Sequence, residues 1–272
     1  MKKGFFNARS AVSSAIGALG HLAENKCIPV DNKVDPEKRI FADQVLFGEV
    51  LKNLLSNSIK FCRKGDQITF FTPEDRPSAV GLRDTGVGIN PRIIMDIFKY
   101  EVKTSTRGTD QELGTGLGLP YSHEIMVFHG GSLTVESIEG AGSAFYAEVP
   151  AERPVVLIVD DEIFHRALLK NYLSGMGVNI MEAANGSEAL LAIKERAPHV
   201  VVADVMMPVM DGFELLNEVR KNPATSATPF IIVTGMADMD VNQKSALLGA
   251  DDFMVKPVSG EEFVSRLRKF IG

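Results

Sequence analysis

The sequence predicts an α/β protein with two domains, an α+β sandwich in the first half and a doubly wound (βα)5 domain in the second. In the first half, helical patterns and strand-like runs are segregated, which is typical of α+β sandwiches. In the second half, strands and helices alternate, and the runs at residues 155–159, 200–203 and 230–233 are nearly continuous aliphatic stretches. Strands without in/out alternation are buried on both faces, so we expect a parallel sheet covered by helices on each side.

The boundary between the two domains is predicted at residues 149–154, a segment with two prolines and no periodic pattern. A chain of 272 residues, of which 45% are apolar and 24% charged, is long enough for two globular cores. We therefore expect residues 1–150 to form the first domain and residues 151–272 the second.

The elements of the first half follow from its apolar spacing. A helical pattern covers residues 8–24, and Asp43 is a plausible N-cap for a second helix. The apolar stripe of that second helix is predicted to contain Val45, Leu46, Val50, Leu51, Leu54 and Leu55. The remaining predicted elements are strands at residues 67–72 and 78–82, a helix near 117–129, and strands near 132–137 and 143–149.

Composition excludes several classes of protein. The net charge is -6, and the second half carries 12 basic against 17 acidic side chains, so we expect no nucleic-acid partner. Cys27 and Cys62 are too few for a disulfide framework or a metal cluster, and we expect both to be buried small hydrophobes in a reducing cytoplasm. No stretch reaches the roughly 18 apolar residues that a membrane helix needs, and no secretory signal follows Met1. We therefore expect a cytoplasmic chain without membrane contact.

The second predicted helix carries a polar face suited to a nucleotide. Asn53, Asn57 and Lys60 stand at i, i+4 and i+7, so two amides and an ammonium share one side of the helix. Amide oxygens can ligate Mg²⁺, and the lysine can meet a phosphate. Asp84 comes at a strand end beside a tight glycine turn, where its carboxylate could accept a hydrogen bond from an exocyclic amine such as that of adenine.

Two glycine-rich segments complete this pattern. Gly86 and Gly88 follow Asp84 and let the backbone approach a base, while the segment 114–118 precedes a helix and exposes N–H groups to an anion. Each cluster alone is more often a turn or a polar surface. The second segment lacks the parallel βαβ frame of a Rossmann fingerprint, and no GxxxxGK[ST] sequence occurs.

Taken in order, with the later segments 129–137 and 140–143, these clusters resemble the N, G1 and G2 boxes of the histidine kinase ATP-binding domain, a Bergerat-type fold, over roughly residues 5–150. The resemblance implies that Asn57 is the Mg²⁺ ligand, that Asn53 and Lys60 lie near the phosphates, and that Asp84 reads adenine. It further implies that Gly86 and Gly88 shape the base pocket. The phosphate-binding residues at one edge of a mobile lid, about residues 99–113, would be Gly114, Thr115, Gly116, Leu117 and Gly118.

Departures from this family bear on activity. Related gyrase- and heat-shock-type ATPases carry a Glu where Asn53 stands, and since an amide cannot act as that base, Asn53 favours phosphoryl transfer over hydrolysis. Glu101 replaces the second Phe of the family's phenylalanine box. No histidine matches the phosphoacceptor motif, so we expect a truncated piece or a separate subunit that is monomeric and does not phosphorylate itself. A membrane anchor elsewhere in a longer parent protein is compatible with this expectation.

Polar residues follow the strands of the second half. Asp160 and Asp161 come after its first strand, Asp204 after the third, Thr234 after the fourth and Lys256 after the fifth. All five therefore fall at the carboxyl ends of a parallel sheet, where ligands collect. Clustered carboxylates repel each other, and Mg²⁺ is the natural cation for their oxygens. The lysine and threonine can then hold the remaining oxygens of a phosphoryl group.

This arrangement resembles the response-regulator receiver domain, with its flavodoxin-like fold, over residues 154–272. The resemblance implies that Asp204 is phosphorylated, that Asp160 and Asp161 hold Mg²⁺ with help from the Met206 carbonyl, and that Thr234 and Lys256 sense the phosphate. Phe253 occupies the aromatic switch position.

Both resemblances together imply part of a hybrid sensor histidine kinase, which binds ATP and Mg²⁺ as cofactors and receives phosphate on Asp204 in a His-to-Asp relay. The implied partners are a histidine phosphoacceptor (dimerisation) domain and a downstream phosphotransfer protein or response regulator. Two alternatives stay open: a catalytically idle nucleotide-binding module with a regulatory receiver, and a gyrase-type ATPase, against which Asn53 argues.

Overall fold

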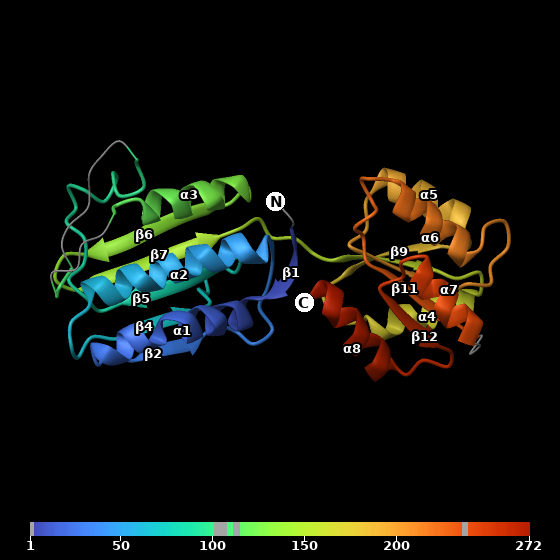
Figure 1. The fold of residues 1–272 in the computed structure, drawn as a ribbon, viewed down its shortest axis with the longest axis horizontal. Coiled ribbons are helices and arrows are strands. Elements are labelled where there is room, and N and C mark those ends of the chain that lie inside the picture. The colour runs from blue at the N-terminus through green and yellow to red at the C-terminus, as the bar shows by residue number, and fades with distance from the viewer. Residues whose placement is uncertain (1–2, 101–107, 111–114, 236–238) are drawn as a thin grey trace. The chain divides into compact units, whose positions relative to one another are not determined.

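The computed structural model describes residues 3–100, 108–110, 115–235 and 239–272. The chain divides into two compact units, Met1–Glu152 and Arg153–Gly272 (Figure 1). Each unit contains a five-stranded sheet with its own helices. The expected combination of an α+β sandwich followed by a doubly wound domain is confirmed.

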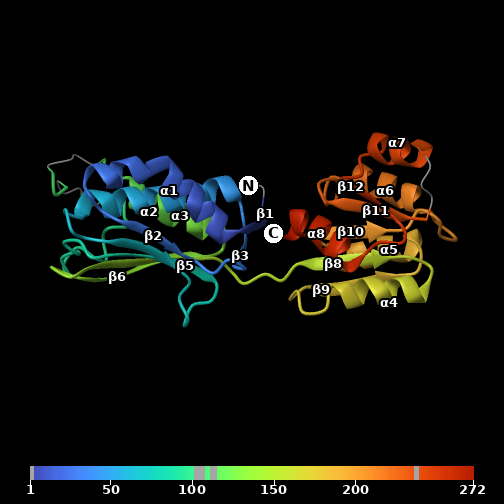
Figure 2. The ribbon, with the colours of Figure 1, turned by 90° about the horizontal axis from the view of Figure 1, so that it is seen from below.

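The first unit is a mixed sheet with three helices on one face (Figure 2). Its strand order is β2-β4-β5-β7-β6, in which β2 and β4 run parallel and the other neighbours are antiparallel. The strands are β2 (Val30–Lys33), β4 (Ile68–Phe71), β5 (Ala79–Asp84), β6 (Ser132–Ile138) and β7 (Gly142–Glu148). The helices are α1 (Ala8–Asn25), α2 (Gln44–Phe61) and α3 (Gly118–Phe128). A separate antiparallel pair joins β1 (Gly4–Asn7) to β3 (Arg39–Ala42).

Helix α2 contributes much of the core of this unit. It begins as predicted, because the Asp43 side chain accepts hydrogen bonds from the backbone N–H groups of Val45 and Leu46. The prediction that Val45 lies in the core was wrong, since this side chain is 74% exposed while Phe47 is fully buried. At 3.6 residues per turn, Val45 lies about 200° round the helix axis from Phe47, so one of the two must face away from the core.

The second unit is a parallel sheet in the order β12-β11-β10-β8-β9. Counted along the chain from β8, this is the doubly wound order 2-1-3-4-5. Its strands are β8 (Val155–Val159), β9 (Asn179–Ala183), β10 (Val200–Ala203), β11 (Phe230–Thr234) and β12 (Asp252–Val255). Its helices are α4 (Ile163–Tyr172), α5 (Gly186–Glu195), α6 (Gly212–Lys221), α7 (Met239–Leu247) and α8 (Gly260–Ile271).

Strand β8 explains why the aliphatic runs of this unit are continuous. Its alternate residues Val156 and Ile158 pack with α4 and α8, whereas Leu157 and Val159 pack with α5 and α6. Both faces of the sheet are therefore covered, as the lack of alternation predicts.

The two cysteines, both expected to be buried, differ in exposure. Cys62 is buried as expected, but the prediction for Cys27 was wrong: it is exposed, because it stands in the turn after α1 with a φ of 56°, beyond the last packed residue of the helix. Among the described residues, no helix is both long and apolar enough to cross a membrane.

Candidate functional site

The first unit contains a pocket of about 840 Å³ between α2, the end of β5 and the start of α3. Gly86 and Leu117 are not among its lining residues, and Gly114 lies outside the described residues, as does most of the expected lid. The predicted site residues that line the pocket are Asn53, Asn57, Lys60, Asp84, Gly88, Thr115, Gly116 and Gly118.

Asp84 is held rigidly at the pocket wall. It is the last residue of β5 and is 5% exposed. Its Oδ1 accepts hydrogen bonds from the backbone N–H groups of Gly86 (3.0 Å) and Ser143 (3.3 Å), and its Oδ2 accepts one from the Ser58 hydroxyl (3.0 Å). Burial raises the pKa of this carboxyl, although the three hydrogen bonds partly offset the effect. Since a carboxylate oxygen offers two lone pairs, Oδ2 can still accept a hydrogen bond from a ligand.

Asn53 is fixed by contacts with α3. Its Nδ2 donates to the hydroxyl of the fully buried Ser122 at 2.8 Å. A Cβ on Gly118 would lie 2.4 Å from Asn53 Oδ1, so only glycine allows the start of α3 to come this close to α2. Sequence reasoning missed Ser122, because a serine within an apolar helix carries no signal until its partner is known.

Asn57 presents a buried donor to the pocket. Among the described residues its Nδ2 finds no hydrogen-bond partner, although the atom is shielded from solvent. An unpaired buried polar group is costly, so this amide fits a polar ligand such as a phosphate oxygen or the oxygen shell of Mg²⁺. The Lys60 ammonium, 4.8 Å from the Phe61 ring centroid, also borders the pocket.

Lys26 of the turn after α1 is a pocket residue that sequence reasoning missed. Its Nζ donates to the carbonyl of Ile59 (3.0 Å) and to the hydroxyl of Thr109 (2.8 Å), and it pairs with Asp110 at 3.6 Å. The Thr109 hydroxyl in turn donates to the carbonyl of Cys62 at 2.7 Å. Lys26 thereby links α1 and the C-terminal end of α2 to residues 109–110.

The glycines after Asp84 have separate roles. Gly88 lines the pocket with a φ of +68°, and a Cβ there would lie 2.1 Å from the Ile138 carbonyl oxygen. Gly86 lies behind the wall, where a Cβ would lie 2.5 Å from the Phe61 carbonyl oxygen. Gly86 therefore shapes the turn that holds Asp84, whereas Gly88 forms part of the pocket surface.

The second unit brings three of its predicted residues together. Asp160, directly after β8, and Asp204, directly after β10, are both buried. Lys256, directly after β12, donates from Nζ to Oδ2 of Asp160 at 2.7 Å and to Oδ2 of Asp204 at 2.6 Å. Burial alone would lower the pKa of Lys256, but the bonds to the two carboxylates outweigh it and the pKa is raised.

The other predicted residues lie around this cluster. The side chains of Asp161 and Met206 are exposed, and the Met206 backbone N–H donates to Asp204 Oδ1 at 3.3 Å. Thr234 is the last residue of β11 rather than the residue after it; it is fully buried, and its carbonyl accepts the Lys256 N–H at 2.8 Å. Phe253 is half-buried and packs against the core of this unit.

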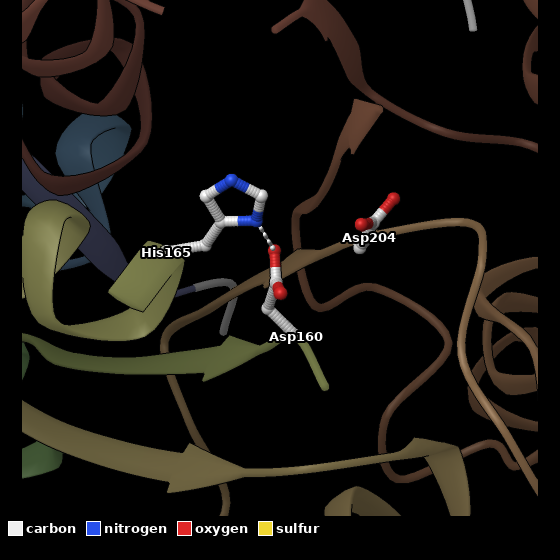
Figure 3. A group of neighbouring side chains, drawn as sticks. All are labelled: Asp160, His165 and Asp204. Carbon is white, nitrogen blue, oxygen red and sulfur yellow. Dashed lines mark ion pairs between the residues drawn. The ribbon is translucent and has the colours of Figure 1, made fainter. Parts of the chain in front are cut away.

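His165 is a neighbour of the cluster that sequence reasoning missed. It stands in the first turn of α4, and its Nδ1 lies 3.5 Å from Asp160 Oδ2 and 3.0 Å from Lys256 Nζ. Figure 3 shows the imidazole turning its Nδ1 edge toward the Asp160 carboxylate, with Asp204 opposite. The usable signal was its place at the start of the helix that follows the aspartate pair, from which a side chain can reach back over the strand ends.

Each of the two units matches the model of a known family. Residues 42–153 match the family described as histidine kinase-, DNA gyrase B-, and HSP90-like ATPase, and residues 156–268 match the response regulator receiver domain. Most of the residues that line the pocket fall within the first matched region. The cluster around Asp204 falls within the second.

Several curated proteins align with nearly the whole chain. The sensor protein EvgS of Escherichia coli strain K12 is 28% identical over 91% of this chain, which is 23% of EvgS. The sensor histidine kinase TmoS of Ectopseudomonas mendocina is 24% identical over 92% of this chain and 30% of TmoS. The autoinducer 2 sensor kinase/phosphatase LuxQ of Vibrio vulnificus strain YJ016 is 26% identical over 89% of this chain and 31% of LuxQ. The chain thus spans less than a third of the length of these relatives.

Proposed function

The chain contains a histidine kinase-type ATPase domain followed by a response regulator receiver domain, the arrangement of hybrid histidine kinases, and we propose that it binds MgATP in the first domain and accepts phosphate on Asp204 in the second. The observation that carries the receiver half of this proposal is the Lys256 ammonium, held between the buried carboxylates of Asp160 and Asp204. This ammonium, at the same edge of the sheet as Asp204, can pair with an oxygen of an incoming phosphoryl group.

In the first domain, the pocket supports adenine nucleotide binding. Asp84 offers a fixed, buried acceptor for an exocyclic amine, and Gly88 lines the same pocket. Asn57 and Lys60 supply an unpaired amide and an ammonium for the phosphates and their Mg²⁺. Thr115, Gly116 and Gly118 border the same pocket at the N-terminus of α3, where backbone N–H groups favour an anion.

The proposed reaction of the first domain is phosphoryl transfer to a histidine on a separate phosphoacceptor domain. Asn53 supports transfer over hydrolysis, because its amide is bound to Ser122 and cannot deprotonate a water molecule. The acceptor domain and a downstream phosphotransfer protein or response regulator are the proposed partners. A gyrase-type ATPase is disfavoured by the same amide.

In the second domain, Asp204 attacks the phosphorus of a phosphohistidine. An O–P bond to an Asp204 carboxylate oxygen forms, the N–P bond breaks, and the leaving imidazole takes up a proton. Two carboxylates that already converge on a cationic nitrogen fit a hard divalent cation, which would be held by Asp160, Asp161, Asp204 and the Met206 carbonyl. Such a cation supplies charge neutralisation to the phosphoryl group. Lys256 and Thr234 hold the remaining phosphoryl oxygens.

Replacing the acceptor tests this function. Asp204→Asn should abolish phosphorylation by acetyl phosphate, since an amide oxygen is not a sufficient nucleophile, and intact-mass spectrometry should show no added phosphate. Glu195→Gln, which removes an exposed carboxylate from α5, is the matched control and should be labelled like the wild type. Phosphate that remains on the Asp204→Asn variant would overturn the assignment.

A further inference from the structure

Three potential ligand atoms of the receiver domain converge on one cationic point. Asp160 Oδ2, Asp204 Oδ2 and His165 Nδ1 lie 2.7, 2.6 and 3.0 Å from Lys256 Nζ. The same three residues offer ligand atoms that all lie within 4.8 Å of one another. The ammonium therefore marks a position at which two carboxylate oxygens and one imidazole nitrogen already face a positive charge. The ligands proposed above for the divalent cation are all oxygens and do not include this nitrogen.

The Nδ1 atom of His165 is the one that faces the cluster. An ammonium only donates hydrogen bonds, so the 3.0 Å contact between Lys256 Nζ and His165 Nδ1 is a hydrogen bond in the tautomer whose Nδ1 lone pair points into the cluster. The same atom lies 3.5 Å from Asp160 Oδ2 and 3.7 Å from a carboxylate oxygen of Glu162. A metal ion binds this same lone pair, and the neutral imidazole is the form in which histidine acts as a ligand.

The local fold keeps the imidazole in place. His165 belongs to the first turn of α4, five residues after Asp160, whose carboxylate it faces (Figure 3). Its side chain is 35% exposed, so a hydrated ion has access from solvent. The Asp160 side chain is 2% exposed. A carboxylate this deeply buried needs a neighbouring positive charge, which either the Lys256 ammonium or a metal ion can provide.

We propose that His165 is a nitrogen ligand of the divalent cation of this receiver, and that it makes the site prefer Co²⁺, Ni²⁺ or Zn²⁺ over Mg²⁺. The proposal rests on the cation site proposed for phosphorylation of Asp204. Imidazole nitrogen suits the later transition metals, whereas an all-oxygen set suits Mg²⁺. The incoming ion displaces the Lys256 ammonium from the three ligand atoms and leaves it available for a phosphoryl oxygen.

Calorimetric titration of the full chain with CoCl₂ and with MgCl₂, without nucleotide, tests the proposal. His165→Asn keeps a polar side chain but removes the imidazole nitrogen. We expect it to lower the Co²⁺ affinity by about tenfold or more while the Mg²⁺ affinity changes less than about threefold. His21→Asn, which removes an exposed imidazole from α1, is the matched control and should leave both affinities unchanged.

The absorption spectrum of bound Co²⁺ gives a second readout that does not depend on activity. Its visible bands should shift in His165→Asn, and in His165→Gln if the asparagine variant does not fold, because a nitrogen ligand has been lost. Equal Co²⁺-to-Mg²⁺ affinity ratios and equal spectra in the wild type and the variant would overturn the role of His165 and leave the proposed function standing. If Asp204→Asn binds both ions as well as the wild type does, the cation site itself is wrong, and the cation-dependent phosphorylation of Asp204 proposed above fails with it.

Discussion

At the scale of single residues, the proposed role of Asp84 in adenine binding can be tested directly by substitution. Asp84→Asn keeps one acceptor oxygen but replaces the other by an amide N–H₂ group, which cannot accept the Ser58 hydroxyl or an adenine amine. We expect ATP to bind more weakly by roughly 1–3 kcal/mol, which calorimetry can measure. Asp75→Asn, at an exposed position of the same domain, should not alter the affinity. Equal affinities for the wild type and Asp84→Asn would exclude Asp84 from the base pocket.

The protonation of Asp84 makes base binding dependent on pH. Because burial raises the pKa of this carboxyl, it takes up a proton at a higher pH than an ordinary aspartate does. The ionised form is the acceptor, so adenosine affinity should be full above the raised pKa and fall as the pH drops through it. Adenosine is the suitable probe because it carries no titrating phosphate. In Asp84→Asn the adenosine affinity should not show this dependence on pH. An adenosine affinity of the wild type that does not change with pH would contradict the prediction.

Residues at strand ends could be predicted from the sequence, whereas their tertiary partners could not. Asp160 and Asp204 follow aliphatic runs, Lys256 follows the last strand, and parallel strands bring such positions to one edge. Ser122 and His165 take part only because another element packs against them. Helical periodicity predicts which side of a helix is apolar. It does not predict which polar group of another element a polar side chain of that helix will contact.

At the scale of elements, the start of α2 gives a measurable prediction. Asp43→Ala removes the acceptor for two backbone N–H groups and should lower the free energy of unfolding of the first domain by about 1 kcal/mol, within a range of about 0.5–2. Asp43→Asn should retain most of the stability, since asparagine is an equally good N-cap. Urea unfolding followed by circular dichroism measures both variants. Equal losses in the two variants would mean that the carboxylate acts by its charge rather than as a cap.

Elements with strong periodicity were predicted closely, and short polar ones were not. The pattern at residues 8–24 matches α1 (Ala8–Asn25), and the expected strand at residues 78–82 continues two residues further to Asp84. The strands β1, β2 and β3 were missed because each of these four-residue segments includes a strongly polar or charged residue, whereas β4 and β10, of the same length, do not. A segment such as Val30–Lys33, with three polar residues, becomes a strand only because β4 lies beside it.

At the scale of the whole molecule, each domain has a complete core of its own. The first is built around α2 and the mixed sheet, and the second fills both faces of the parallel sheet. Residues that share a core unfold together, because the cooperativity of unfolding depends on the contacts within that core. Two separate cores therefore allow two separate unfolding transitions.

We therefore expect calorimetric unfolding to show two transitions, only one of which responds to MgATP. A ligand that binds the folded domain stabilises it by RT ln(1 + [L]/Kd), about 2.7 kcal/mol at a hundredfold excess over Kd, and this gain belongs to the domain that holds the pocket. At a fixed free Mg²⁺ concentration, the receiver transition should stay in place when ATP is added, and it should shift when the divalent cation itself is added. Asp84→Asn should reduce the nucleotide shift and leave the receiver transition unchanged, which identifies the two events. A single transition, or two that move equally with MgATP, would show that the domains unfold as one cooperative unit.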